Sequence, residues 1–490
     1  MEVKTQRFRR ASTQALADDS LQSAMGRAIG HFDQARQAAI EELTPELWER
    51  YRQRGQEIKS HTIENLDYYL GLLAWRVEGN GGTVHFATDT REATDIVLDL
   101  ARTRGVKSVV KSKSMLSEEM DLNSALESQD IEPVETDLGE YIIQLAGETP
   151  FHIIAPAMHK SKEEVSELFF DKLRTPRLTE IEEMAAAARQ ALRQKFLDAD
   201  MGISGVNFAV AETGTVVIVT NEGNGRMCTS LPRIHVALMG MEKVVPALED
   251  MAVMLRLLPR AATGQRITSY VTFVSGPRRR SDEDGPDEFH LVIMDNNRSK
   301  LLADPELREA LNCIRCGACL NTCPVYQKVG GHAYGYVYPG PIGAVITPVM
   351  VGLPKAKDLP FASSLCGACR EVCPIKINIP RMLLKLRGDL AEGGRGQRKV
   401  SWWERALVRA WAITVRSERS LAWTRGIASL LQRPFVSGGR MRRIPFPPFS
   451  RWTRNRDFPG LAPRSFHQQW EKELKDRPSS TPPPDVRKRE

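Results

Sequence analysis

The chain has 490 residues, 42% apolar and 26% charged, which are the proportions of a globular protein large enough for two or three domains. The net charge of +7 is uneven, because residues 381–490 carry 25 Lys+Arg against 10 Asp+Glu and so form a basic end on a mildly acidic body. Eight cysteines in this length exclude a secreted disulfide scaffold, and the lack of an apolar run of about 20 residues excludes a membrane span, so a cytoplasmic protein is expected.

Residues 1–80 are predicted to form an N-terminal helical region. Apolar side chains recur at helical spacing over residues 11–37 and again over residues 65–77. Such stripes are typical of amphipathic helices that bury one face. We therefore expect a helical collar that packs on the domain that follows.

Residues 81–298 alternate short apolar runs with helical patterns, which indicates an α/β domain with a largely parallel sheet. The predicted strands are 83–87, 108–111, 151–155, 208–211, 215–219, 234–238, 270–274 and 288–294. The predicted helices include 90–103, 117–127, 162–172 and 179–199. Glycine-rich turns separate several of these elements.

Three features of this domain could form a pocket for a small acid. The glycines of residues 221–226 would let backbone N–H groups converge on an anion, and Arg226 could pair with a carboxylate. Lys111 and Lys113 lie at the end of another predicted strand, and Glu212 begins a Glu-Thr-Gly turn. Glu212, Arg226 and Lys113 are therefore catalytic candidates, the alternative being that they only close turns. No dinucleotide-binding fingerprint is present, so no tightly bound NAD is expected.

Seven of the eight cysteines lie in two runs within residues 299–392. The first run has the C-x2-C-x2-C-x3-C-P spacing of bacterial-type iron–sulfur ligation, and the second run repeats its last three cysteines. A zinc site commonly uses two pairs of ligands and a longer spacer, so it fits this spacing less well. These residues are predicted to form an α-helical ferredoxin-type domain for two clusters, with a loop over 330–343 and a helix over 379–389. Cys228 stands apart and is expected to be a buried apolar side chain.

The cysteine spacing also predicts how the ligands are shared. In two-cluster ferredoxins the fourth cysteine of a run binds the other cluster. One cluster would then be held by Cys313, Cys316, Cys319 and Cys373, and the other by Cys323, Cys366 and Cys369.

The second ligand set has one position without a cysteine. Alignment of the two runs places Ser363 where the first run has Cys313. Both clusters are expected to be 4Fe-4S, but the second could be a 3Fe-4S cluster or be completed by Ser363 or another group. This open position makes the second cluster the expected place for any chemistry beyond electron relay.

The end of the chain divides into a basic, Trp-rich helical region over residues 393–435 and a Pro/Arg-rich, partly disordered tail over residues 436–490. The apolar side chains of residues 401–433 could dock on a partner, make peripheral contact with an anionic membrane, or pack on the cluster domain. Their helical spacing favours packing. No nucleic-acid-reading motif is present, so nucleic acid is not an expected partner.

Several motifs in combination resemble those of the lactate utilization protein B family. They lie at residues 111–119, 211–215 and 221–226 in the α/β region, and at residues 312–326, 330–335, 338–343 and 364–369 around the cysteines. The resemblance implies that the α/β region is a lactate-utilization domain, similar to the sugar-isomerase and CoA-transferase-like folds.

The resemblance also implies a function. The chain would be the iron–sulfur electron-transfer subunit of a three-protein, NAD-independent system that oxidises L-lactate to pyruvate. Its implied partners are a cysteine-rich CCG-type subunit, a second lactate-utilization-domain protein and an electron acceptor. Two alternatives stay open: electron transfer for another 2-hydroxy acid dehydrogenase, and an iron–sulfur-dependent regulatory protein. The sequence names no residue for the oxidation of the C–H bond.

Overall fold

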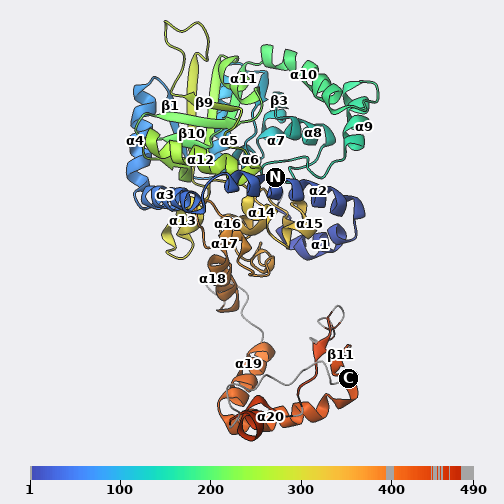
Figure 1. The fold of residues 1–490 in the computed structure, drawn as a ribbon. Helices are drawn as coiled ribbons and strands as arrows, with labels where there is room; N and C mark the ends of the chain where they lie inside the picture. The colour runs from blue at the N-terminus through green and yellow to red at the C-terminus, as the bar shows by residue number, and fades with distance from the viewer. Residues whose placement is uncertain are drawn as a thin grey trace. The chain divides into compact units, whose positions relative to one another are not determined.

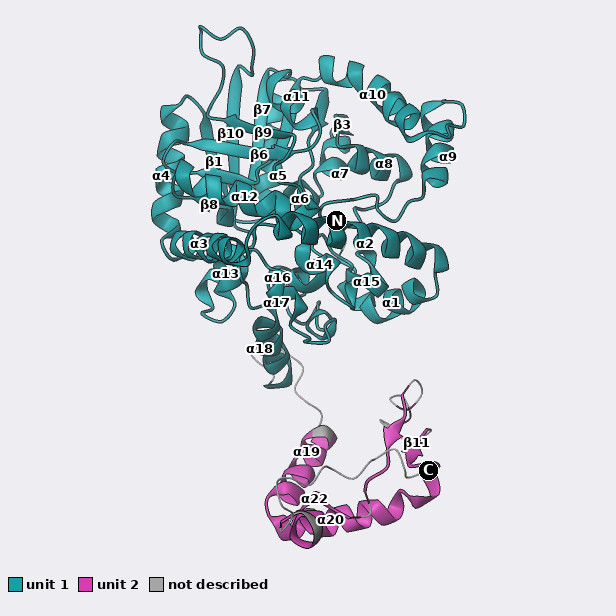
Figure 2. Ribbon diagram, viewed as in Figure 1, with its two compact units in different colours: residues 1–399 teal, residues 400–490 magenta. Residues whose placement is uncertain are grey.

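A computed structural model describes residues 3–392, 402–442, 444, 450, 453, 456–462 and 464–475. The chain forms two compact units, residues 1–399 and residues 400–490 (Figure 2). The first unit holds the predicted α/β domain and both cysteine runs, and the second unit holds the basic end of the chain.

The centre of the first unit is a six-stranded, wholly parallel sheet in the order β1-β10-β7-β4-β2-β3 (Figure 1). Its strands are β1 (Thr83–Ala87), β2 (Ser108–Lys111), β3 (Glu132–Glu135), β4 (Met201–Gly205), β7 (Ile234–Gly240) and β10 (Glu288–Met294). Every residue of β7 is buried, as expected of a central strand covered on both faces. The prediction of a parallel α/β domain is confirmed, although β3 and β4 were not predicted.

A second sheet of four strands lies in the same unit, in the order β8-β5-β6-β9. Its strands are β5 (Phe208–Val210), β6 (Thr215–Thr220), β8 (Val244–Val245) and β9 (Tyr270–Val274). The pairs β5–β6 and β6–β9 are antiparallel, whereas β5 and β8 run parallel.

The strand predicted over residues 151–155 is wrong, because this segment is an irregular loop. The backbone N–H groups of Ile154 and Ala155 donate to Nδ1 of His152, at 3.1 and 3.2 Å, and Phe151 donates to the carbonyl of Pro156. A side chain that binds the N–H groups of its own neighbours removes the donors that a strand ladder needs.

Helices surround the sheets (Figure 1). They are α5 (Thr90–Thr103), α6 (Met115–Met120), α7 (Leu122–Glu127), α8 (Leu138–Ala146), α9 (Lys162–Leu173), α10 (Ile181–Leu197), α11 (Asn224–Ser230) and α12 (Leu248–Thr263). The single helix predicted over 117–127 is two helices, because Asp121 between them adopts a left-handed conformation with φ 53°. A helix cannot continue through that conformation.

The N-terminal region is helical as predicted and contacts both the α/β domain and the cysteine region. It comprises η1 (Thr5–Arg7), α1 (Phe8–Leu16), α2 (Asp19–Glu41), α3 (Pro45–Glu64) and α4 (Leu66–Gly79). Helix α3 packs against α12 of the α/β domain, while its Arg52 donates to the backbone carbonyls of Glu371 and Cys373. One continuous apolar core joins these helices, the second sheet and the cysteine region. The cysteine runs are therefore fixed against the α/β domain.

The cysteine region consists of short helices. They are α13 (Arg298–Ala303), η3 (Arg308–Asn312), α14 (Ala318–Asn321), α15 (Tyr326–Val329), η4 (His332–Tyr334), α16 (Gly340–Val351), η5 (Leu359–Phe361), α17 (Ala368–Glu371) and α18 (Ile379–Glu392). The predicted loop over 330–343 is wrong at its end, because α16 begins at Gly340. Pro341 is compatible with this start because the first turn of a helix does not use its N–H group.

The second unit contains α19 (Trp402–Val415), α20 (Glu418–Leu431), η6 (Arg433–Phe435), β11 (Arg440–Met441), β12 (Phe458–Pro459), α22 (Phe466–Gln469) and η7 (Trp470–Leu474). Packing on the cluster domain, which belongs to the other unit, stays a prediction, whereas the helical prediction is confirmed within this unit. Trp402, Trp411 and Trp423 are 82%, 64% and 70% exposed, so they form no core there. Contact with a partner or an anionic membrane also stays a prediction. Of the tail predicted to be partly disordered, residues 476–490 lie outside the described residues.

No helix among the described residues is both long and apolar enough to cross a membrane.

Candidate functional site

The two cysteine runs repeat one backbone conformation. Gly317 and Gly367 precede α14 and α17 with left-handed φ angles of 75° and 87°. Two residues earlier, Arg315 and Leu365 are also left-handed, with φ of 60° and 57°, which is uncommon for residues with a side chain. These paired turns carry two cysteines of each run, Cys316 and Cys319 in the first and Cys366 and Cys369 in the second.

The first thiol set is Cys313, Cys316, Cys319 and Cys373, which together line one small cavity. Cys373 comes from the second run, so the structure brings together the four residues that the ligand exchange predicts. Six isoleucines complete most of the apolar lining: Ile153, Ile314, Ile342, Ile375, Ile377 and Ile379. Three of the four cysteines are buried and Cys313 is partly exposed, so this centre lies inside the protein.

The second thiol set is Cys323, Cys366 and Cys369. Burial first, and then the charges of the neighbouring Cys323 and Cys366, raise the pKa of the Cys369 thiol to about 12. Cys323 and Cys369 are buried, whereas Cys366 is exposed. The second centre therefore reaches the protein surface.

Ser363 occupies the place in the second run that Cys313 has in the first. The backbone N–H of Arg315 donates to Sγ of Cys313 at 3.4 Å, and the backbone N–H of Leu365 donates to Oγ of Ser363 at 3.1 Å. The same hydrogen bond thus recurs two residues after each side chain. The serine hydroxyl therefore has the same local backbone hydrogen bond as the Cys313 thiol.

The spacing of the sulfur atoms fits clusters better than a single zinc ion. Sulfurs around tetrahedral zinc would lie about 3.8 Å apart, given Zn–S bonds of about 2.3 Å. Across the described residues, which include all eight cysteines, no three sulfurs lie within 4.8 Å of one another. Cys228 is buried in α11 against the hydroxyl of Thr136 and lies in neither set.

A large cavity of about 530 Å³ lies at the carboxyl edge of the parallel sheet. Residues at or just after four strand ends line it, namely Ser112–Ser114, Asp137, Gly205 and Gly240. Ligands of open parallel sheets bind at this edge. The cavity also reaches Arg315, which lies between Cys313 and Cys316, and is therefore bounded by both the α/β domain and the cysteine region.

Charged groups line this cavity. Lys113 donates from Nζ to the carbonyl of Ile154 at 2.6 Å, while Lys243 and Arg315 add further positive charge. Glu222 lies at an exposed part of the lining, where surrounding protein atoms first, and Asp137 second, raise the pKa of its carboxyl to about 7. The cavity thus combines cationic groups beside the first thiol set with a titratable acid nearer to solvent.

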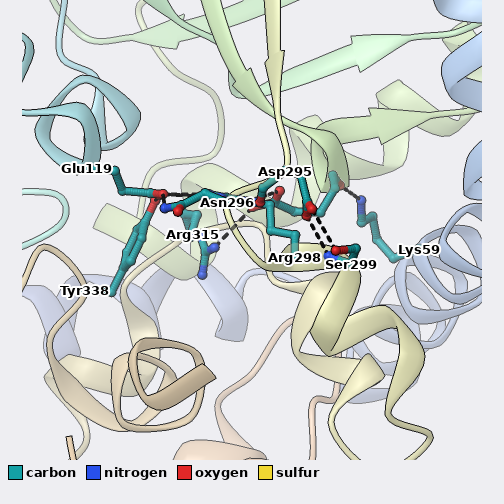
Figure 3. A network of polar contacts seen from close by, with 9 residues as sticks. Lys59, Glu119, Asp295, Asn296, Arg298, Ser299, Arg315 and Tyr338 are labelled. Atoms are coloured by element: carbon teal, nitrogen blue, oxygen red, sulfur yellow. Dashed lines mark hydrogen bonds and ion pairs between the residues drawn. The ribbon is translucent and has the colours of Figure 1, made fainter. Parts of the chain in front are cut away.

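A buried network of ion pairs ties the two domains together beside the cavity (Figure 3). Arg298 donates to Oε1 of Glu119 and to Oε2 of Glu242, at 2.7 Å each, and Arg315 donates to Oε1 of Glu242 at 3.1 Å. The phenol of Tyr338 donates to Glu119 and lies under the guanidinium of Arg315, whose Cζ is 4.4 Å from the ring centre. Burial alone would raise the pKa of Glu242, but Arg298 and Arg315 hold it at about 2.

The candidates predicted in the α/β domain lie apart from one another. Lys113 lines the cavity, whereas Glu212 is exposed and accepts from the N–H of Leu248 at the start of α12. Arg226 is exposed on α11 and does not line the cavity. Lys111 is buried, and its Nζ lies 2.5 Å from the carboxylate of Glu135, so it serves an internal ion pair.

Sequence reasoning missed Glu242 and Lys243, while Tyr338 and Arg315 lay within the motifs at residues 338–343 and 312–326 without being placed at a cavity. Glu242 and Lys243 lie in η2 (Met241–Lys243), just after the central strand β7. One signal could have revealed Glu242 and Lys243: they form a polar pair directly after a buried central strand. The carboxyl ends of such strands meet at the ligand-binding edge of a parallel sheet.

Two family models match the chain. The LUD domain matches residues 72–294, and the 4Fe-4S dicluster domain matches residues 309–377. The matched ranges contain all six strands of the parallel sheet and all seven clustered cysteines.

Curated relatives match along nearly the whole chain. Lactate utilization protein B of Oceanobacillus iheyensis is 45% identical, over 94% of this chain and 94% of its own. The proteins of the same name from Bacillus licheniformis and Bacillus subtilis are each 43% identical, over 97% and 96% of this chain and 99% and 97% of their own. A solved structure of a DUF162 family protein from Deinococcus radiodurans is 15% identical over 47% of this chain and 98% of its own, with a TM-score of 0.24.

Proposed function

This chain belongs to the lactate utilization protein B family, and from that premise we propose that it is the iron–sulfur electron-transfer subunit of a multi-protein system that oxidises L-lactate to pyruvate. The observation that carries the proposal is the position of the two thiol sets, one buried beside a ligand-sized cavity and the other at the surface. The proposed partners are a cysteine-rich CCG-type subunit, a second lactate-utilization-domain protein and an electron acceptor.

We assign one 4Fe-4S cluster to Cys313, Cys316, Cys319 and Cys373, and a second cluster to Cys323, Cys366 and Cys369. Such clusters supply transfer of one electron at a time. The isoleucine lining keeps water from the first thiol set, while Arg52 holds the carbonyl of Cys373 and so fixes the loop that carries it. Exposed Cys366 gives the second set the access that electron exchange with a partner requires.

The burial of the two thiol sets indicates the order in which electrons pass through them. The first thiol set shares Arg315 with the cavity, so electrons from a ligand there would enter at this end. The second set is the one that reaches the surface, and it is therefore the proposed exit. This order differs from the expectation that chemistry beyond relay belongs at the second cluster.

The function is tested by purifying the chain without oxygen and adding the partner proteins. We expect about eight irons per chain, from two four-iron clusters, and a reduced-cluster EPR signal that L-lactate produces only when the partners are present. Another 2-hydroxy acid that reduces the clusters faster than lactate would favour the related dehydrogenase instead. A colourless protein that holds zinc would refute the proposal.

We further propose that Ser363 Oγ is the fourth ligand of the second cluster. The proposal is supported by the backbone hydrogen bond that Ser363 Oγ accepts, which matches the one that Cys313 Sγ accepts in the first run. Ser363→Ala should therefore convert the second cluster largely to a three-iron form during purification in air, visible as a new EPR signal of the oxidised protein. Ser363→Cys should keep four irons there and raise the reduction potential of the second cluster, because a soft cysteine thiolate replaces the harder serine oxygen, which stabilises the oxidised irons more.

The control is Ser128→Ala, which removes an exposed serine hydroxyl at the end of α7, outside both cysteine runs, and it should retain the wild-type iron content. If Ser363→Ala and wild type give the same iron content and the same EPR spectra, another group or an open position completes the second cluster.

A further inference from the structure

We infer that the cavity binds the carboxylate of a 2-hydroxy acid, or of its 2-oxo product, through Arg315 and Lys243. The inference deepens the proposed function, on which the identity of the acid rests. It places a substrate-class site on this chain, directly beside the first thiol set.

Arg315 has donors that the protein does not use. Its side chain is 9% exposed, and one nitrogen donates to Glu242 while the guanidinium face covers Tyr338. The Nε and Nη1 atoms are buried and have no hydrogen-bond partner in the described part of the chain. Buried donors are almost always satisfied, so unpaired ones beside a cavity point to a ligand with acceptor atoms. A carboxylate matches a guanidinium because it accepts two parallel hydrogen bonds.

Lys243 supplies a second cation in the same part of the cavity. It lies in the lining, and among the described residues its Nζ makes no hydrogen bond or ion pair, whereas Lys113 is held by the carbonyl of Ile154. Both carboxylate oxygens of the adjacent Glu242 are already bound by Arg298 and Arg315. Lys243 is thus available to an anion that enters from the sheet edge.

The rest of the lining indicates what the ligand carries besides a carboxylate. Polar groups suited to a hydroxyl or carbonyl include Ser112, Ser114 and Asn207. Much of the remaining wall is apolar, with contributions from Ile153, Ile154, Val206, Met239 and Leu258. A volume of about 530 Å³ exceeds the needs of a three-carbon acid and falls in the range of drug-sized ligands. The site should therefore accept 2-hydroxy acids with side chains longer than a methyl group.

The test measures binding to the full-length holoprotein, purified without oxygen and free of partner proteins. Isothermal titration calorimetry would use oxamate, an unreactive analogue of pyruvate, and then L-lactate, 2-hydroxyhexanoate, acetate and inorganic phosphate. We expect oxamate to bind, and the longer hydroxy acid to bind within about tenfold of lactate. Acetate should bind at least tenfold more weakly than oxamate, because it lacks the second polar group.

The variant Lys243→Met should weaken oxamate binding by about tenfold or more, the loss expected for one charge-assisted hydrogen bond. Arg315→Lys should weaken it as well, because lysine cannot offer two parallel donors. The matched control is Lys195→Met, which removes an exposed lysine of α10 that pairs with Glu132 outside the cavity. Visible absorption of the clusters confirms that each variant is folded and loaded.

Three results would overturn the inference: no oxamate binding, binding that Lys243→Met leaves unchanged, or a preference for phosphate over every carboxylate. A lack of oxamate binding would mean that Arg315 and Lys243 only balance the charge of the cysteine thiolates. Failure of this site is distinguishable from failure of the proposed function. Lactate-dependent cluster reduction with the partners, but no binding to this chain alone, would leave the function standing and place the substrate on a partner.

Discussion

Replacing Cys373 with alanine is expected to remove the cluster whose other three ligands lie in the first cysteine run. Cys373 lines the same cavity as Cys313, Cys316 and Cys319, although it belongs to the second run. The variant should lose about half of its iron, because one of two four-iron clusters cannot be completed. Iron analysis and EPR of the reduced protein would measure this loss.

The identity of the lost cluster is the decisive result. The EPR spectrum of Cys373→Ala should match that of Cys316→Ala and differ from that of Cys369→Ala. Cys228→Ala is the control, since Cys228 lies in neither set, and it should keep all of the iron. A Cys373→Ala spectrum that matched Cys369→Ala would show that each run binds its own cluster.

Replacing Arg298 with alanine should lower the free energy of unfolding by about 3–5 kcal/mol, the cost of breaking a buried ion pair. The side chains of Arg298, Glu119 and Glu242 are each at most 1% exposed. Removal of the arginine leaves both carboxylates without their strongest partner. Denaturant unfolding, followed by circular dichroism of the holoprotein, would measure the change.

Arg102→Ala is the matched control, because Arg102 pairs with Asp99 on the surface of α5, where both side chains are more than two-thirds exposed. Such pairs contribute about 0–1 kcal/mol. An effect of Arg298→Ala no larger than that of Arg102→Ala would contradict the role given to the network.

The effect of Arg298→Ala should also depend on pH in a defined direction. The pKa of Glu242 is about 2 in the folded protein and about 4.5 without its neighbours. A depressed carboxyl pKa stabilises the fold above the unfolded pKa and loses that contribution as the pH falls toward the folded pKa. The difference between wild type and variant should therefore be largest above pH 5 and shrink between pH 4.5 and pH 2.

Local sequence predicted those strands that are built from β-branched and aromatic residues. Strands β1 and β10 have their predicted bounds because each is a short run of such residues between turns. Strand β3 contains Pro133 and strand β4 contains two glycines, so their own sequences disfavour a strand, and pairing with β2 imposes it. The predicted strand at 151–155 failed because the His152 side chain takes the N–H groups.

In the site, too, local sequence predicted some features and not others. Cysteine spacing predicted both thiol sets, since short turns fix where those sulfurs lie. The cavity could not be predicted, because Arg315, Lys243 and Glu222 lie in three distant segments that only the folded sheet edge brings together. Glu212 and Arg226 have the residue types of an anion site, but one binds the start of α12 and the other faces solvent.

Each thiol set contains cysteines from both runs, and this determines when the clusters can be inserted. During synthesis, neither set is complete until the chain has been made beyond Cys366, so both metal centres must be inserted late. Once inserted, each centre would act as a cross-link that closes the segment between the runs, restricting the unfolded chain much as a disulfide does. Oxidative loss of one centre would then release the restraint that helps its neighbour stay assembled.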